Sequence, residues 1–134
     1  MKAEGAVRVL LVDDHALIRA MLTALLADQP GFDVVSACAD VAQAVAAVTT
    51  HRPDVVLMDL NLPGPDGALG AARLRQVHPA GHVLILTGTA YSPRYEVALA
   101  AGACRVLTKD IGVDELTASI RRCADPIEGR CRSA

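Results

Sequence analysis

Three aspartates, a threonine and a lysine stand at the ends of short apolar runs in this sequence. Asp13 and Asp14 follow one such run, Asp59 ends a second, Thr87 ends a third and Lys109 follows a fourth. Short apolar runs rich in β-branched residues are typical of buried strands. We therefore predict that these five side chains mark the carboxyl ends of four strands.

Such residue types work together when they share one edge of a sheet. In α/β folds the carboxyl ends of parallel strands form the ligand-binding edge. Carboxylates crowded there repel one another, so they need a cation to stay ionised. Oxygen ligands suit Mg²⁺, which takes one or two carboxylates and keeps several waters. A hydroxyl, an ammonium and a divalent cation form a cradle for a phosphoryl group, and a carboxylate is a recognised covalent acceptor of one.

Each side chain also has an ordinary structural interpretation. Asp14 suits a helix N-cap, which is compatible with metal binding. Thr87 before Gly88 is common at a strand end, and for Thr87 the two interpretations stay equally open. Lys109 alone suits a surface residue whose stem covers apolar neighbours. Because Lys2 is the only other lysine in a chain that otherwise uses arginine, we favour a specific role for Lys109.

Strand-like and helix-like segments alternate along the chain. Apolar runs predict strands over 7–12, 32–37, 54–59, 82–87 and 104–108. Helical spacing bounded by Pro or Gly predicts helices over 14–28, 40–51, 68–77, 95–101 and 113–124, with Asp40 as an N-cap. Strands without polar alternation belong to a parallel sheet covered on both faces, and right-handed crossovers make this a doubly wound α/β fold.

Length and composition limit the function classes. The 134 residues fit one domain, and 52% apolar residues supply a core. Aromatic residues are 2% and the net charge is −2, which argues against a base-stacking or phosphate-backbone surface. The early charges exclude a signal peptide and no apolar run approaches ~18 residues, so we expect a soluble cytoplasmic protein without membrane contact.

The cysteines and histidines show no metal-binding spacing. Cys38 and Cys104 lie in strand-like runs and are expected to be reduced core thiols. The four histidines are expected at surface or loop positions: His15, His51, His78 and His82.

Four motifs in order carry a family resemblance. They are V-L-L-V-D-D-H, V-V-L-M-D-L-N-L-P-G-P-D-G, V-L-I-L-T-G and A-G-A-C-R-V-L-T-K-D. Together they resemble the receiver domain of bacterial two-component response regulators, over roughly residues 7–124, and the K-D ending resembles the LuxR-type subfamily. The resemblance implies a (βα)5 flavodoxin-like fold with a five-stranded parallel sheet in the order 2-1-3-4-5. It also implies a receiver domain over 1–124 and a tail or linker over 125–134.

The resemblance also implies roles for the site residues. Asp59 would be the phosphoacceptor, served by a sensor histidine kinase or a small donor. Mg²⁺ would be bound by Asp14 directly, Asp13 mainly through water, Asp59 and the backbone carbonyl of Asn61. Two further residues would bond phosphoryl oxygens: Thr87, which moves on activation, and Lys109. Pro63, Gly64 and Gly67 would shape the adjoining turn.

Signal output is implied in the same way. Phosphorylation would switch the surface of the fourth helix, fifth strand and fifth helix, about residues 95–124, and regulate transcription through a DNA-binding domain absent from this chain. No enzymatic turnover is expected, and any homodimer would be weak, using the first or the fourth helix with the fifth. Val106 stands where receivers usually have a switching aromatic, and Tyr91 or Tyr95 is the candidate substitute.

Three other classes stay as alternatives. Val106 leaves open a degenerate receiver that acts as a phosphorylation-independent interaction module. An aspartate-nucleophile phosphatase of the haloacid dehalogenase type would need a D-x-D motif, which the run Asp13-Asp14-His15 lacks. A nucleotide-binding Rossmann domain would need G-x-G-x-x-G after the first strand, and that motif is absent.

Overall fold

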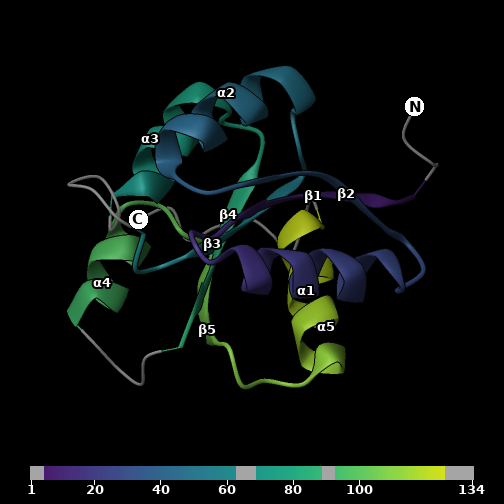
Figure 1. Ribbon diagram of the computed structural model, residues 1–134. Helices are drawn as coiled ribbons and strands as arrows, with labels where there is room; N and C mark the ends of the chain where they lie inside the picture. Colours follow the sequence, from purple (N-terminus) through teal and green to yellow (C-terminus); the bar gives the residue numbers. More distant parts are fainter. Residues whose placement is uncertain (1–4, 63–68, 89–92, 126–134) are drawn as a thin grey trace.

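Five strands and five helices alternate along the parts of the chain that the structure describes (Figure 1). The computed structural model describes residues 5–62, 69–88 and 93–125. The strands are β1 Val7–Val12, β2 Phe32–Cys38, β3 Val55–Asp59, β4 His82–Thr87 and β5 Arg105–Thr108. The helices are α1 Ala16–Ala27, α2 Val41–His51, α3 Gly70–Val77, α4 Pro93–Ala100 and α5 Val113–Ala124.

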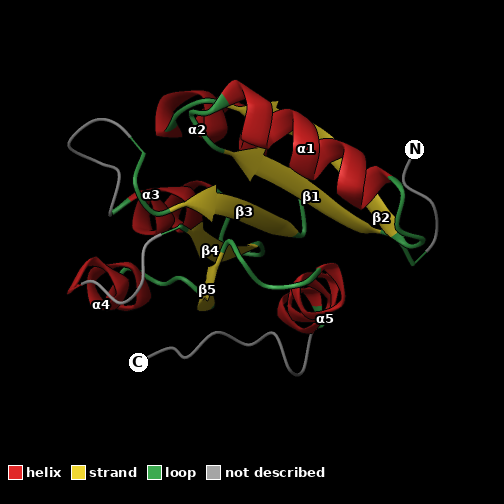
Figure 2. Cartoon of the chain, turned by 60° about the horizontal axis from the view of Figure 1, so that its bottom comes forward, coloured by secondary structure: helices red, strands yellow, loops and turns green. Residues whose placement is uncertain are grey.

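All strand pairs are parallel, and the strand order is β2-β1-β3-β4-β5. Figure 2 shows α1 and α5 on one side of the sheet and α2, α3 and α4 on the other. The doubly wound five-stranded fold predicted from the sequence is therefore confirmed.

The core consists of two apolar layers, one on each face of the sheet. Successive side chains of a strand point to opposite faces. On β1, Leu10 and Val12 pack on the α2–α4 side, whereas Val9 and Leu11 pack on the α1–α5 side. All four are at most 1% exposed. Because both faces are covered, the strands need apolar residues at every position, which explains their continuous apolar runs.

The observed element bounds differ little from the predicted ones. Strand β3 begins at Val55, one residue later than predicted, and the carboxylate of Asp54 before it accepts a hydrogen bond from the backbone N–H of Arg8 at 2.8 Å. Helix α4 begins at Pro93 and ends before Gly102, whose φ of +110° is unfavourable for other residues. Pro63, Gly64 and Gly67 lie outside the described residues.

His78 lies in the loop after α3, as predicted, but it is buried there, whereas the prediction of a surface or loop position was wrong for His82. The side chain of His78 is 7% exposed, and its Nε2 lies 2.7 Å from the carbonyl oxygen of Pro53. Its ring fills space beside Gly81, where an added Cβ would lie 2.6 Å from the imidazole. The ring therefore joins the segments before β3 and β4. His82 lies on β4 and is half-buried.

The thiols lie as expected. Cys38 is buried on the α2–α4 side, and Cys104 is half-buried on the α1–α5 side. Within residues 5–62, 69–88 and 93–125, no helix is long and apolar enough to cross a membrane.

Asp40→Ala is expected to lower the free energy of unfolding by about 1 kcal/mol. The Asp40 carboxylate accepts a hydrogen bond from Gln43 N–H at 2.8 Å, and the Gln43 side chain accepts one from Ala39 N–H at 2.9 Å. The variant leaves a helix-terminal N–H without its acceptor. Urea titration measures the loss, with the exposed Asp28→Ala as control. Equal stability of the two variants would contradict the capping role.

The stability of the fold is expected to decrease below about pH 6.5 partly because of His82. Burial lowers the pKa of His82 from its ordinary value of 6.5, and the positive charge of Arg75 acts in the same direction. As the pH falls through 6.5, the unfolded chain binds this proton before the folded one does. Urea titrations at several pH values should therefore give a shallower acid slope for His82→Gln. An unchanged slope would show that His82 makes no contribution.

Candidate functional site

The register of the sheet brings the predicted site residues to one edge. Val12 pairs with Met58, Asp59 with Leu86 and Thr87 with Thr108. The residues that follow or end these strands therefore meet at the carboxyl edge. The backbone N–H of Lys109 donates to the carbonyl of Thr87 at 2.7 Å, which fixes the lysine beside the end of β4.

Lys109 connects two of the three acidic residues. Its Nζ lies 3.0 Å from Oδ2 of Asp13 and 3.4 Å from Oδ2 of Asp59. Both carboxylates have side chains only 4% exposed, while the lysine side chain is 23% exposed. A buried carboxylate without a partner is costly, so one ammonium stabilises both negative charges. The Lys109 ammonium is therefore paired at this edge of the sheet, although its stem does cover apolar neighbours.

The same contacts determine the titration of this lysine. Burial by itself lowers the pKa of Lys109, but the hydrogen bond that its ammonium donates to Asp13 and the charge of Asp59 raise it above the ordinary 10.5 on balance. The ammonium is therefore charged at neutral pH. It can attract an incoming anion as well as hold the two carboxylates.

Asp14 lies beside this pair at the start of α1. Its side chain is 34% exposed, and its Oδ1 lies 3.2 Å from Nδ1 of His15. The cap position of α1 is His15, with no side-chain cap hydrogen bond. Helix capping, the structural alternative for Asp14, is thus wrong, and this partly exposed carboxylate belongs to the acidic group.

Asn61 follows β3 in the loop. Its backbone N–H donates to Oδ1 of Asp59 at 3.1 Å, so Asp59 is held from both oxygens. Thr87 is fully buried at the end of β4. The direct roles of the Asn61 carbonyl and the Thr87 hydroxyl stay predictions.

The donor set fits a divalent cation. One ligand atom from each of four residues lies within 4.8 Å of the other three: Asp13, Asp14, His15 and Asp59. Several carboxylate oxygens at this separation are the donors that Mg²⁺ prefers. Among the residues that the structure describes, the Lys109 ammonium is the one permanently charged cation in contact with the buried carboxylates of Asp13 and Asp59. Three carboxylates against one ammonium leave net negative charge for a cation to offset.

His15 and Arg19 contribute to the site although the sequence interpretation gave them no role there. The ring of His15 contacts the two adjacent aspartates, and the Arg19 guanidinium donates to the carbonyl oxygen of Asp13 at 2.7 Å. The signal for His15 was its position directly after Asp13-Asp14. The signal for Arg19 was its place one helical turn later, as the lone charged residue of α1.

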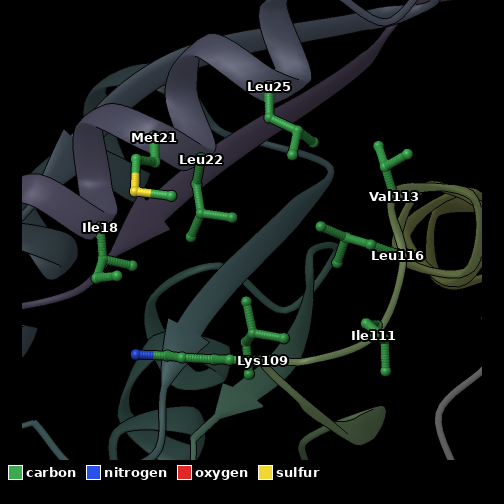
Figure 3. Close-up of a pocket in the computed structure, with 9 residues that line it drawn as sticks. Ile18, Met21, Leu22, Leu25, Lys109, Ile111, Val113 and Leu116 are labelled. Atoms are coloured by element: carbon green, nitrogen blue, oxygen red, sulfur yellow. The ribbon is translucent and has the colours of Figure 1, made fainter.

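An apolar groove of about 190 Å³ adjoins the site (Figure 3). It lies between α1 and α5, and its floor includes the stem of Lys109, whose amine points away from Val113 and Leu116. The other lining residues are all apolar: Ile18, Met21, Leu22, Leu25, Leu86 and Ile111. One lysine thus contacts the acidic cluster with its head and this groove with its stem.

Val106 is half-buried, and it and Tyr95 pack against the core on the α2–α4 side. Val106 belongs to β5 and Tyr95 to α4, so both lie on the surface proposed for signal output. The other candidate substitute, Tyr91, lies outside the described residues.

Comparison with known proteins agrees with this geometry. The family model described as the response regulator receiver domain matches residues 9–121. The response regulator GacA of Pseudomonas viridiflava is 36% identical over 115 residues, which are 86% of this chain and 54% of GacA. A protein-glutamate methylesterase/protein-glutamine glutaminase of Anaeromyxobacter dehalogenans is 38% identical over 110 residues. These are 82% of this chain and 32% of that protein. The chain thus spans about half the length of GacA.

Two solved structures have the same fold. The signal receiver domain of the putative response regulator NarL from Mycobacterium tuberculosis superposes with a TM-score of 0.82 at 34% identity, covering 89% of this chain and 96% of that one. A LuxR-family response regulator from Aurantimonas superposes with a TM-score of 0.82 at 35% identity. The match covers 89% of this chain and 85% of that one. The family match over most of the chain and the shared fold show that this protein belongs to the response regulator receiver domains of two-component phosphorelay systems.

Proposed function

We propose that this chain is a working receiver whose phosphoacceptor is Asp59. The observation that supports this most is the position of the Lys109 ammonium, 3.4 Å from Asp59 and 3.0 Å from Asp13. A buried aspartate beside an ammonium, with further carboxylates that can hold a divalent cation, is suited to receive a group with negative charge. The proposed partner is a sensor histidine kinase, and the chain has no catalytic turnover of its own.

The transfer is a displacement at phosphorus. A carboxylate oxygen of Asp59 forms the new O–P bond, and the P–N bond of the donor phosphohistidine breaks, with its electron pair passing to the imidazole. With acetyl phosphate the broken bond is P–O and acetate leaves. Lys109 stabilises the charge on the phosphoryl oxygens, and Thr87 offers a hydroxyl to another one.

The proposed cofactor is Mg²⁺, held by Asp13, Asp14, Asp59 and the carbonyl of Asn61. When bound, it offsets the charge of the carboxylates and of the incoming phosphoryl group. The chain's own contribution is to keep these oxygens together before the donor arrives. Asp13 is held by Arg19 on its carbonyl and by Lys109 on its carboxylate.

The proposed output is a change of the surface formed by α4, β5 and α5. A phosphoryl group adds nearly two negative charges beside Thr87 and Lys109, which precede α4 and α5. Movement of these two residues would change how both helices pack. We propose a receiver over 1–124 and a linker or tail over 125–134. We also propose a cytoplasmic role in transcription through a DNA-binding domain outside this chain, because a LuxR-family response regulator is among its structural relatives.

The test is the intact mass of the protein after incubation with acetyl phosphate and Mg²⁺. We expect one phosphoryl group per chain, and none when a chelator removes the Mg²⁺. No adduct on the folded protein with acetyl phosphate or a phosphorylated kinase would contradict the proposal. It would favour the degenerate receiver, which acts without phosphorylation.

We also propose that a second copy packs weakly on α1 and α5. Leu17 on α1 is 72% exposed, and Met21, which lines the apolar groove described above, is 57% exposed. A two-fold arrangement would place these side chains of each copy in the groove of the other. Met21→Glu should abolish the concentration dependence of sedimentation, whereas Leu69→Glu, at a residue 51% exposed elsewhere, should keep it. Equal behaviour of both variants would exclude this surface.

A further inference from the structure

The imidazole of His15 is part of the acidic cluster although it is largely exposed. Its Nδ1 lies 3.3 Å from Oδ1 of Asp13 and 3.2 Å from Oδ1 of Asp14, and 67% of the side chain is exposed. The backbone holds it there, because the N–H of His15 donates to the same Oδ1 of Asp13 at 2.9 Å. The ring is thus directed back over the two carboxylates it follows in sequence.

The distance from Nδ1 to each carboxylate oxygen is one that two donors on the same small ion can have, and ligand atoms of the two aspartates and His15 all lie within 4.8 Å of one another. Donors on a tetrahedral ion at about 2.0–2.1 Å stand roughly 3.3 Å apart, and donors on adjacent octahedral positions stand roughly 3.0 Å apart. The oxygens of Asp13 are also divided between the two sides of the site. Lys109 contacts Oδ2 of this residue, and His15 contacts Oδ1. The ammonium therefore leaves Oδ1 available on the side of His15.

A nitrogen donor changes which cation a site prefers. Mg²⁺ favours oxygen ligands, whereas imidazole suits Co²⁺, Ni²⁺ and Zn²⁺. A cluster of carboxylates alone would bind Mg²⁺. It would bind transition cations more tightly only to the extent that any site of this kind does along the series from Mn²⁺ to Cu²⁺. An imidazole in reach of the same ion adds affinity for the transition cations without adding to that for Mg²⁺.

We propose that His15 is an additional ligand that lets the acidic site bind divalent transition cations of the Co²⁺ class in competition with Mg²⁺. This inference rests on the cation site of the proposed function, and His15 determines the preference within that site. A transition cation bound this way occupies the oxygens of Asp13 and Asp14 that Mg²⁺ would use.

The experiment measures Co²⁺ and Mg²⁺ affinities by calorimetry on the full chain with its thiols reduced. His15→Asn should weaken Co²⁺ binding by about tenfold or more and change the Mg²⁺ affinity by less than about twofold. His51→Ala, which removes a half-buried histidine at the end of α2, is the matched control and should keep both affinities. Mg²⁺ should displace Co²⁺ from the wild-type protein.

Three results would overturn the inference while leaving the proposed function intact. They are an unchanged Co²⁺ affinity in His15→Asn, an equal loss for both cations in that variant, and Co²⁺ that Mg²⁺ does not displace. Failure of the wild-type protein to bind either cation would overturn both the inference and the proposed Mg²⁺ site. Circular dichroism of each variant shows that it is folded before affinities are compared.

Discussion

Asp59→Asn is expected to abolish the phosphoryl adduct and leave the chain folded. The amide has nearly the shape of the carboxylate, but it is a poor nucleophile toward phosphorus. Removing this charge also leaves Lys109 paired with Asp13 at 3.0 Å, so no buried ammonium is stranded. The repulsion between the buried Asp13 and Asp59 carboxylates disappears as well. Intact mass after acetyl phosphate treatment measures the adduct, and urea titration measures the stability.

The matched control is Asp33→Asn, the same change on β2 at the amino end of the sheet. This variant should be phosphorylated like the wild type because Asp33 is remote from the carboxyl edge. A full adduct in folded Asp59→Asn would place the acceptor on another residue and refute the assignment.

Lys109→Met is expected to have the largest effect on stability and phosphorylation together. The variant keeps the stem but leaves the carboxylates of Asp13 and Asp59, each 4% exposed, without their shared counter-charge. Breaking a buried pair typically costs roughly 3–5 kcal/mol. Because the lysine is 23% exposed, solvent weakens the effect, and we expect a loss of about 1–3 kcal/mol in the absence of Mg²⁺. The adduct should decrease by about tenfold or more, since a charge that stabilises the transferred group is lost.

Added Mg²⁺ gives this prediction a sharper form. A cation that binds the folded state stabilises it, and Mg²⁺ binds more tightly where no ammonium opposes it. Urea titration should therefore show a larger Mg²⁺-dependent gain in Lys109→Met than in the wild type, with Lys109→Arg intermediate. An equal gain in all three proteins would mean that Lys109 and the cation do not share the same carboxylates.

Alkaline pH removes the same interaction from the wild type. Because the folded-state pKa of Lys109 lies above 10.5, its contribution is complete below that pH. It decreases as the pH rises toward and through the folded-state pKa. The Lys109→Met variant should lack this part of the alkaline loss of stability, and the same alkaline slope in both proteins would contradict the pairing.

The sequence predicted the fold well because a sheet covered on both faces leaves a strong local pattern. Strand β4 and helix α5 have the predicted bounds, and Asp40 caps α2 as expected. Gathering Asp13, Asp59 and Lys109 at one edge followed from topology alone, since parallel strands place their carboxyl ends together. Their individual distances needed the register of the sheet.

What the sequence could not supply depends on contacts between segments far apart in the chain. His78 lies in a loop as expected, but its burial was not predictable, because its ring contacts the carbonyl of Pro53, 25 positions earlier. Lys109 and Asp13 are separated by 96 positions, so no local pattern reports their 3.0 Å contact. The ring orientation of His15 was hidden for a different reason. A side chain next to two aspartates can point either way, and backbone geometry decides.

The most direct test of the central claim is to locate the phosphoryl group after treatment with acetyl phosphate and Mg²⁺. Borohydride reduces an acyl phosphate to an alcohol, which converts a phosphorylated aspartate into homoserine. Peptide mapping by mass spectrometry then shows which residue was modified. We predict homoserine at Asp59 and unmodified aspartate at positions 13 and 14. Homoserine at Asp13 or Asp14, or no conversion at Asp59 in a protein that carries the adduct, would contradict the account.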